Sequence, residues 1–203
     1  MKNFITLSIA TMLLVGCAGN EPHDSIDSVY LNNPYRFLAM DSKKEYEKII
    51  IQLTNHIEID KRAIYALNNR ALAYNESGMW KKAISDLEAV LELSPNTYVP
   101  YHNLGDIYQE KGNLERALEL YSLAIGRFPD DAVCIRARAY AYFESGRWIE
   151  AIRDFDSALK LEPNQKQNYL DRASAKEKIG DKDGAKRDRE IASHLKNQYL
   201  YLN

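Results

Sequence analysis

The sequence predicts an all-α solenoid built from stacked pairs of antiparallel helices. The phrase ESGMWKKAISDLEAVLELSPN at residues 76–96 returns 68 residues later, at 144–164, as ESGRWIEAIRDFDSALKLEPN. Four glycines mark the same repeat, because they follow one another at intervals of 34 residues: Gly78, Gly112, Gly146 and Gly180. Apolar stripes with helical spacing run between these glycines. One helix pair cannot bury both of its faces, so each copy must shield its neighbour.

Residues 1–16, MKNFITLSIATMLLVG, predict an export signal. They combine one Lys near the start with an apolar run from Phe4 to Val15, and they contain no acidic residue. The run is short for a permanent membrane-spanning helix. Residues 14–17, LVGC, resemble the lipobox of bacterial lipoproteins. The resemblance implies that Cys17 receives diacylglycerol and that cleavage precedes it. A plain signal peptide, cut at another bond, is the alternative.

Residues 17–28 predict a flexible tether, since they are rich in Gly, Pro, Asn, Asp and Ser. Acylation of Cys17 would hold the following domain at a membrane through lipid. Ala18, in place of Asp directly after the modified Cys, resembles the outer-membrane class of Gram-negative lipoproteins. We therefore expect a lipid-anchored protein at the outer membrane, facing the periplasm.

Residues 29–63 predict a degenerate first repeat. Val29–Met40 is its expected first helix, and the stretch EYEKIIIQLTNHIEID, Glu45–Asp60, is its expected second helix. Ile49 and Leu53 fall at the alanine and aromatic positions of the later repeats. The register of the repeat therefore starts before the first clear copy.

Residues 64–97, 98–131 and 132–165 are three clear repeats. In each of them a glycine can take the left-handed conformation that closes the first helix, and a proline marks the break after the second helix. The other recurring positions are small residues at Ala71, Gly105, Ala139 and Ala173, alanines at Ala83, Ala117, Ala151 and Ala185, apolar or aromatic residues at Leu87, Tyr121 and Phe155, tyrosines at Tyr74, Tyr108 and Tyr142, and prolines at Pro95, Pro129 and Pro163.

This pattern resembles the tetratricopeptide repeat, whose period is also about 34 residues. The resemblance extends from Ile64 to about Tyr199. It implies a right-handed superhelix in which the small residues of each first helix face the alanines of the second. Residues 166–203 are a degenerate last repeat and C-terminal cap, because Lys176 and Arg189 stand where earlier repeats carry Tyr and an aromatic or Leu residue. We expect these two side chains to meet water.

The sequence contains no zinc-protease motif, nucleophile elbow, phosphate-binding loop or cluster of Cys and His. We therefore expect no catalytic residue, no cofactor and no metal site. His102 and Asp106 lie one helical turn apart, a spacing that suits a metal or a proton relay, although a solvated contact is the more ordinary outcome. Cys134 has no partner once Cys17 is acylated, so we expect an inert packed thiol.

The charge balance excludes a strong electrostatic field for nucleic acid. Cleavage after residue 16 removes Lys2 from the 27 basic residues, so 26 remain against 29 acidic residues and the net charge is −3. The apolar content of 45% is ordinary for a globular protein. We expect no nucleic-acid partner.

Tetratricopeptide arrays generally bind peptides or partner proteins on the surface lined by the first helix of each repeat. By the family's register, the resemblance implies these contact residues: Tyr65, Asn68, Asn69, Leu72, His102, Asn103, Asp106, Arg136, Tyr140 and Phe143. Such side chains suit hydrogen bonding to an extended backbone together with aromatic contacts. The alternative is that they form only a solvated inner wall.

A special case is the clamp with which related domains grip the acidic tails of heat-shock chaperones. That clamp uses two Lys, two Asn and one Arg, and the matching positions of this chain hold Asn68, Leu72, Asn103, Val133 and Ala137. Only Asn103 fits, so the sequence disfavours this ligand.

We therefore expect a membrane-anchored scaffold or adaptor of the bacterial cell envelope, not an enzyme, that binds other envelope proteins or peptides. Two alternatives stay open. One is a self-associating structural lipoprotein that pairs with a second copy through Val29–Asp60 or through the tail Asn197–Asn203. The other is a glycan-binding protein or enzyme of the cell wall, which is favoured only by the 14 tyrosines.

Overall fold

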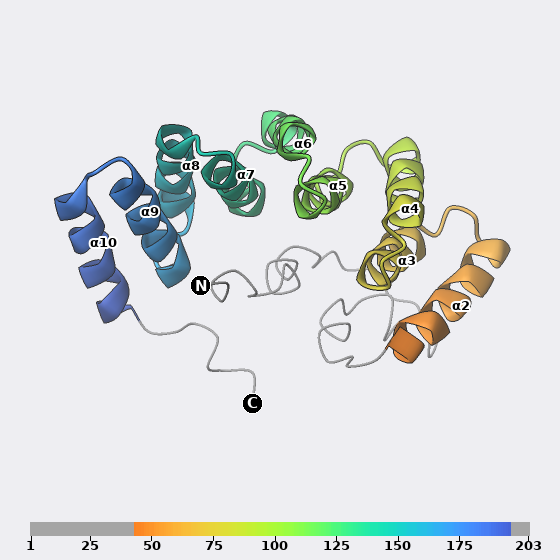
Figure 1. Ribbon diagram of the computed structural model, residues 1–203. Helices are drawn as coiled ribbons and strands as arrows, with labels where there is room; N and C mark the ends of the chain where they lie inside the picture. The colour runs from red at the N-terminus through yellow and green to blue at the C-terminus, as the bar shows by residue number, and fades with distance from the viewer. Residues whose placement is uncertain (1–42, 196–203) are drawn as a thin grey trace. The chain divides into compact units, whose positions relative to one another are not determined.

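The computed structural model describes residues 43–195, which form nine helices and no strand (Figure 1). The predicted all-α fold is therefore confirmed for this part of the chain. The helices are α2 (Lys43–Ile59), α3 (Ile64–Glu76), α4 (Trp80–Leu93), α5 (Val99–Glu110), α6 (Leu114–Arg127), α7 (Ala132–Glu144), α8 (Trp148–Leu161), α9 (Lys166–Lys178) and α10 (Lys182–His194). The predictions for residues 1–16, Cys17, the tether, Val29–Met40 and the tail Asn197–Asn203 lie outside the described residues. Among the described helices, none is both long and apolar enough to span a membrane.

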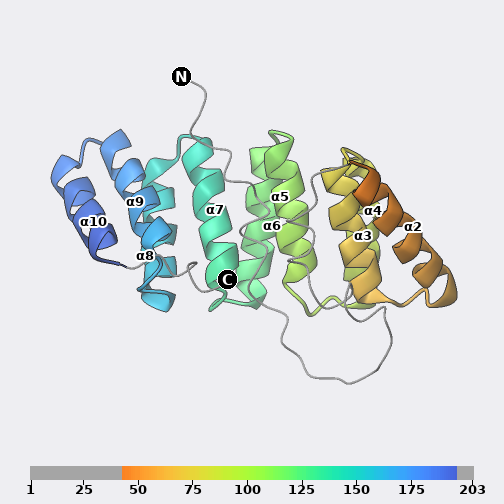
Figure 2. The ribbon, with the colours of Figure 1, turned by 90° about the horizontal axis from the view of Figure 1, so that it is seen from below.

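The chain divides into two compact units, unit 1 up to Ile107 and unit 2 from Tyr108 onward. In unit 1, α3 packs between α2 and α4. In unit 2, α7 packs between α6 and α8, and α9 packs between α8 and α10. Figure 2 shows the two helices of a pair, such as α9 and α10, lying side by side. The helices α3, α7 and α9 are each the first helix of a repeat. Each is covered by the second helix of its own repeat and by the second helix of the preceding repeat, as the stacking argument requires.

Glycine ends the first helix of each repeat, as predicted. After α3, the backbone of Gly78 has φ +78°, and the N–H of Met79 donates to the carbonyl oxygen of Tyr74 at 2.7 Å. The N–H of Gly78 donates to Asn75 at 2.8 Å, so the two bonds form a Schellman cap. The same φ recurs at Gly112, Gly146 and Gly180, with values of 78°, 76° and 84°.

The cores follow the repeated positions. In unit 1, Ile49 and Leu53 of α2 are buried against Ala66 and Ala73 of α3. In unit 2, one cluster joins α6 to α7 through Ala117, Leu118, Tyr121, Ala137 and Ala141. A second joins Ala139 of α7 to Ala151 and Phe155 of α8. The contact between a small residue and an alanine is therefore present where the pattern predicted it.

Three arginines, which the pattern of apolar positions did not reveal, connect successive helices. Arg70 of α3 donates from Nε and Nη2 to both oxygens of Asp86 in α4, each at 2.7 Å. Its Nη1 donates in the opposite direction to Thr54 of α2 at 3.1 Å. Arg138 of α7 repeats this arrangement with Asp154 and Ser122. One guanidinium thus holds three helices in register, through a bidentate contact of the strong charge-assisted kind.

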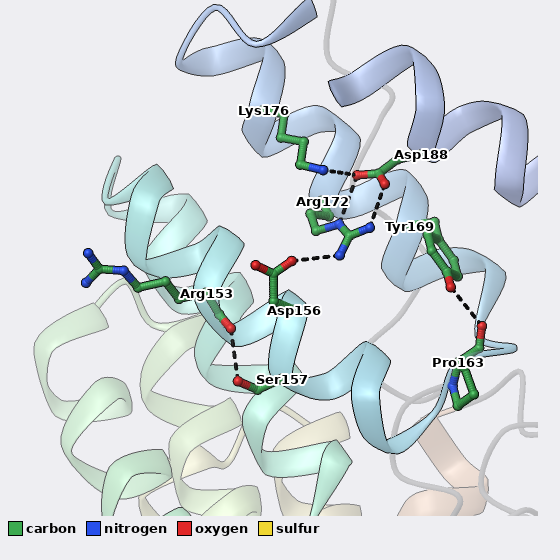
Figure 3. A network of polar contacts seen from close by, with 8 residues as sticks. All are labelled: Arg153, Asp156, Ser157, Pro163, Tyr169, Arg172, Lys176 and Asp188. Carbon is green, nitrogen blue, oxygen red and sulfur yellow. Dashed lines mark hydrogen bonds and ion pairs between the residues drawn. The ribbon is translucent and has the colours of Figure 1, made fainter. Parts of the chain in front are cut away.

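Figure 3 shows the third of these arginine bridges, at α8, α9 and α10. Arg172 of α9 lies between Asp156 of α8 and Asp188 of α10, with N···O distances of 2.6 Å to each. Lys176 also reaches Asp188, at 2.9 Å. Lys176 is therefore half-buried rather than fully hydrated as expected, because Asp188 draws its ammonium group inward. Arg189 is exposed, in agreement with its predicted place in the cap, and pairs with Glu177.

Candidate interaction surface

In unit 1 the predicted contact residues of α3 form one stripe. Tyr65, Asn68 and Leu72 are spaced by three and four residues, so they lie on one face of the helix. Tyr65 is 57% exposed, whereas Asn68 and Leu72 are half-buried. Asn69, predicted in the same group, is buried. The stripe therefore offers an open aromatic ring, an amide and an apolar side chain in sequence along the helix.

A hydrogen bond links this stripe to α5. Asn103 donates from Nδ2 to Oδ1 of Asn68 at 2.9 Å. Asn103 is only 3% exposed, and its Oδ1 atom is buried without a hydrogen-bond partner among the described residues. A buried acceptor without a donor lowers stability by about 1–3 kcal/mol. The amide pair formed by Asn68 and Asn103 therefore contains one unsatisfied acceptor, which lies below the solvent-accessible surface.

His102 and Asp106 of α5 are in contact, as their spacing predicted. Nδ1 of His102 lies 3.2 Å from Oδ2 of Asp106, and the His102 side chain is 3% exposed. Within residues 43–195, no third His, Cys, Asp or Glu joins them in a group that could hold a metal ion. The pair is a local contact between neighbouring turns of α5.

In unit 2 the structure places Arg136, Tyr140 and Phe143 of α7 in three different environments. Arg136 is buried and pairs through Nη1 with Oε2 of Glu162 at 3.1 Å. The Tyr140 hydroxyl donates to Asp171 of α9, and its ring meets Phe155 edge-on, with 5.4 Å between the ring centroids. Phe143 packs, half-buried, against the cluster of Ala139, Ala151 and Phe155. A carboxylate of the chain itself therefore already engages Arg136.

Asp171 and Gln167 of α9 belong to this surface, although the sequence analysis did not name them. Gln167 donates from Nε2 to Oδ1 of Asp171 at 2.9 Å. Burial raises the pKa of Asp171 above its ordinary value, although the bonds from Tyr140 and Gln167 and the charge of Arg136 act in the opposite direction. The signal that could have found both residues is the register itself, since 34-residue steps lead from Tyr65 to Gln167 and from Asn103 to Asp171.

Solved structures of low sequence identity share this fold. The crystal structure of MamA has a TM-score of 0.67 and 19% identity, and the match covers 74% of this chain and 88% of that one. A MamA from Desulfovibrio magneticus RS-1 gives a TM-score of 0.64 at 18% identity, with 77% and 96% covered. YrrB, described as a TPR protein with an unusual peptide-binding site, gives 0.61 at 18% identity, with 87% and 89% covered.

Curated relatives match over part of their length. A tetratricopeptide repeat and J domain-containing co-chaperone of Fusarium oxysporum is 32% identical over 55% of this chain and 23% of its own length. The STIP1 homolog of Dictyostelium discoideum is 24% identical over 60% of this chain and 28% of its own length. A UDP-N-acetylglucosamine–peptide N-acetylglucosaminyltransferase of Giardia intestinalis is 27% identical over 61% of this chain and 8% of its own length. The chain thus spans less than a third of each of these relatives.

Family models agree with the helix pairs. Two models, both described as tetratricopeptide repeat, match residues 62–130 and 132–165, and together they cover just over half of the 203 residues. The first match contains α3 to α6 and the second contains α7 and α8. The repeated small residues, glycine caps and buried alanines of the three clear repeats lie within these matched ranges. The chain belongs to the tetratricopeptide repeat family.

Proposed function

We propose that this protein is an interaction scaffold that binds an extended segment of a partner protein along α3 and α5 of unit 1. The observation that carries the proposal is the pair of Asn68 and Asn103. Oδ1 of Asn103 is a buried acceptor without a donor among the described residues. Asn68 accepts from Asn103, so its own Nδ2 is left to donate. When the Asn103 amide turns outward, this acceptor and this donor match the N–H and C=O of a peptide group.

Side-chain contacts would add to this backbone contact. Tyr65 is more than half exposed and lies one turn from Asn68, and Leu72 follows one turn further along the same stripe. Exposed tyrosines are frequent anchors of protein interfaces because the ring supplies a large contact area with little conformational entropy to lose. The names of several relatives, such as Hsp70-Hsp90 organizing protein of Arabidopsis thaliana, describe assembly of other proteins and support a role of this class. No catalytic role is part of the proposal.

The proposed location is the bacterial envelope. Its support is the sequence alone: an export-type segment at residues 1–16, followed by Cys17 at the end of a lipobox-like stretch. Acylation at Cys17 would anchor the protein to a membrane, and the partners would then be other envelope proteins. Incorporation of radiolabelled palmitate tests this step, with Cys17→Ser as the control. Equal labelling of both proteins would contradict it.

The binding surface is tested separately by crosslinking in cells and identification of partners by mass spectrometry. Tyr65→Ala and Asn103→Ala should each reduce recovery of specific partners. Asn55→Ala is a matched control, because Asn55 is an exposed asparagine of α2, a helix outside the proposed surface. Circular dichroism establishes that each variant retains its helices. If all variants recover every partner equally, the proposed surface on α3 and α5 is wrong.

A further inference from the structure

Asp171 is a carboxylate without a counter-ion on the surface of α7 and α9. Its two oxygens accept from Tyr140 and from Gln167, both neutral side chains. Among the described residues, no Lys, Arg or His lies within ion-pair distance of it. The nearby Arg136 is held by Glu162, and Arg136 acts on Asp171 only through space. The charges of Arg136, Glu162 and Asp171 sum to −1.

Three buried aspartates of the repeats differ from Asp171 because each of them has an arginine partner. Asp86, Asp154 and Asp188 each receive a bidentate contact from an arginine sixteen residues earlier. Asp171 has no such arginine, although it is itself half-buried. Burial accordingly raises its pKa. A partly desolvated carboxylate that is held in place by neutral donors would be stabilised by an approaching cation, because the attraction between opposite charges is stronger away from bulk water.

We infer that Asp171 is the counter-ion for a Lys or Arg side chain of a partner segment that binds at α7 and α9, and that unit 2 thereby selects segments that carry a basic residue. The inference rests on the proposed function, since it adds a specificity to peptide binding. Tyr140 and Gln167 are positioning residues, because their hydrogen bonds fix the two carboxylate oxygens. An acidic segment is disfavoured at this place, since it would meet the carboxylates of Asp171 and Glu162.

A selection experiment with the full chain in detergent tests the inference. A display library of random ten-residue peptides is selected on the wild-type protein, and the enriched peptides are synthesised with a fluorescent label. Each is also made with its basic residue replaced by Gln. Affinities of both forms are measured for the wild type, for Asp171→Asn and for Asp183→Asn. Asp183 is a matched control because it is an exposed aspartate of α10.

The expected result is enrichment of peptides with one Lys or Arg at a fixed position. Asp171→Asn should weaken their binding by about tenfold or more, as truncation of a hydrogen-bonded charge pair does. Replacement of the peptide's basic residue by Gln should weaken binding to the wild type by the same factor. It should leave binding to Asp171→Asn almost unchanged. Asp183→Asn should leave every affinity unchanged. If the two changes together weaken binding no more than either change alone, Asp171 and the basic residue contact each other directly.

Two outcomes would overturn the inference in different ways. If peptides are enriched and depend on Tyr65 and Asn103, but carry no preferred basic residue or bind Asp171→Asn equally well, only the role of Asp171 is wrong. If no peptide is enriched, the proposed peptide binding itself fails and this inference fails with it.

Discussion

Arg138 holds both carboxylate oxygens of Asp154, with Nε to Oδ2 at 2.7 Å and Nη2 to Oδ1 at 2.9 Å. The two residues come from the two helices of one pair, and Asp154 is buried. Nη1 of the same guanidinium donates to Oγ of Ser122 in the preceding helix, α6. This polar contact lies where a helix repeat would ordinarily be expected to have only apolar packing.

We expect Arg138→Leu to lower the free energy of unfolding by about 3 kcal/mol, because it leaves the buried carboxylate of Asp154 without its partner. The double change Arg138→Leu/Asp154→Leu should restore most of that loss. The second clear repeat supports this expectation, since Leu104 and Leu120 occupy the equivalent positions and are both buried. Urea unfolding followed by circular dichroism measures both values. A double variant less stable than the single one would contradict the argument.

The arginine bridges show what the sequence predicted and what it did not. The 34-residue register predicted the helix ends and the buried alanines, because these positions depend on contacts that every repeat makes in the same way. It did not reveal Arg138 and Asp154, since a salt bridge depends on where two side chains meet in space. The recurrence of Arg70, Arg138 and Arg172 directly before a small residue is the signal that could have revealed the bridges.

For the candidate surface too, the register predicted which helix faces take part but not how their side chains meet. The register placed Asn68 and Asn103 on one surface, where a hydrogen bond joins them, and the spacing of His102 and Asp106 predicted their contact. It did not show that Asn69, His102, Asn103 and Arg136 are buried, because burial depends on the neighbouring helices and not on the helix that carries the residue. Similarly, the register named Arg136 but not its partner Glu162, the residue that follows α8.

Two glycines of unit 2 should respond to substitution by Ala with opposite changes in the free energy of unfolding. Gly146 has φ +76°, so Gly146→Ala should lower the free energy of unfolding by about 1–2 kcal/mol, the cost of a left-handed L-residue. Gly126 lies inside α6 without a positive φ, and an added Cβ there meets no atom within 4 Å. Gly126→Ala should therefore raise the free energy of unfolding by about 0.5–1 kcal/mol, since Ala is the better helix former. Chemical denaturation of the two variants measures this difference, and equal shifts would contradict it.

Asn168 is a site where a polar side chain lowers stability. It is 1% exposed, and neither its Oδ1 nor its Nδ2 has a hydrogen-bond partner among the described residues. The equivalent positions of the earlier repeats hold Ala66, Pro100 and Cys134, which are all buried. We expect Asn168→Ala to raise the free energy of unfolding by about 1 kcal/mol, because it removes the unsatisfied amide. A thermal midpoint below that of the wild type would show that the amide makes a favourable contact in solution.

Asp188 and Asp171 should give the stability opposite dependences on pH. Burial raises the pKa of Asp188, but the hydrogen bonds and charges of Arg172 and Lys176 outweigh burial and leave the pKa below its ordinary value. Its ionised form therefore stabilises the fold above the unfolded pKa of about 3.9, and this contribution is lost as the pH falls through the lower folded pKa. Asp188→Asn should melt below the wild type at pH 7, and the difference should shrink at acid pH.

For Asp171 the sign is reversed, because burial raises its pKa in the folded protein. Ionisation of Asp171 then costs stability above that raised pKa, and the cost disappears as the pH falls to the unfolded value of about 3.9. Asp171→Asn should therefore melt above the wild type at pH 7 and approach it at acid pH. Thermal unfolding between pH 7 and pH 3 gives one curve of melting temperature against pH for the wild type and one for each variant. At pH 7 the wild type should lie between the two variants. If Asp171→Asn melts below the wild type at pH 7, the carboxylate already has a cationic partner within the folded chain, and its assignment as the counter-ion of a partner's basic residue loses its physical basis.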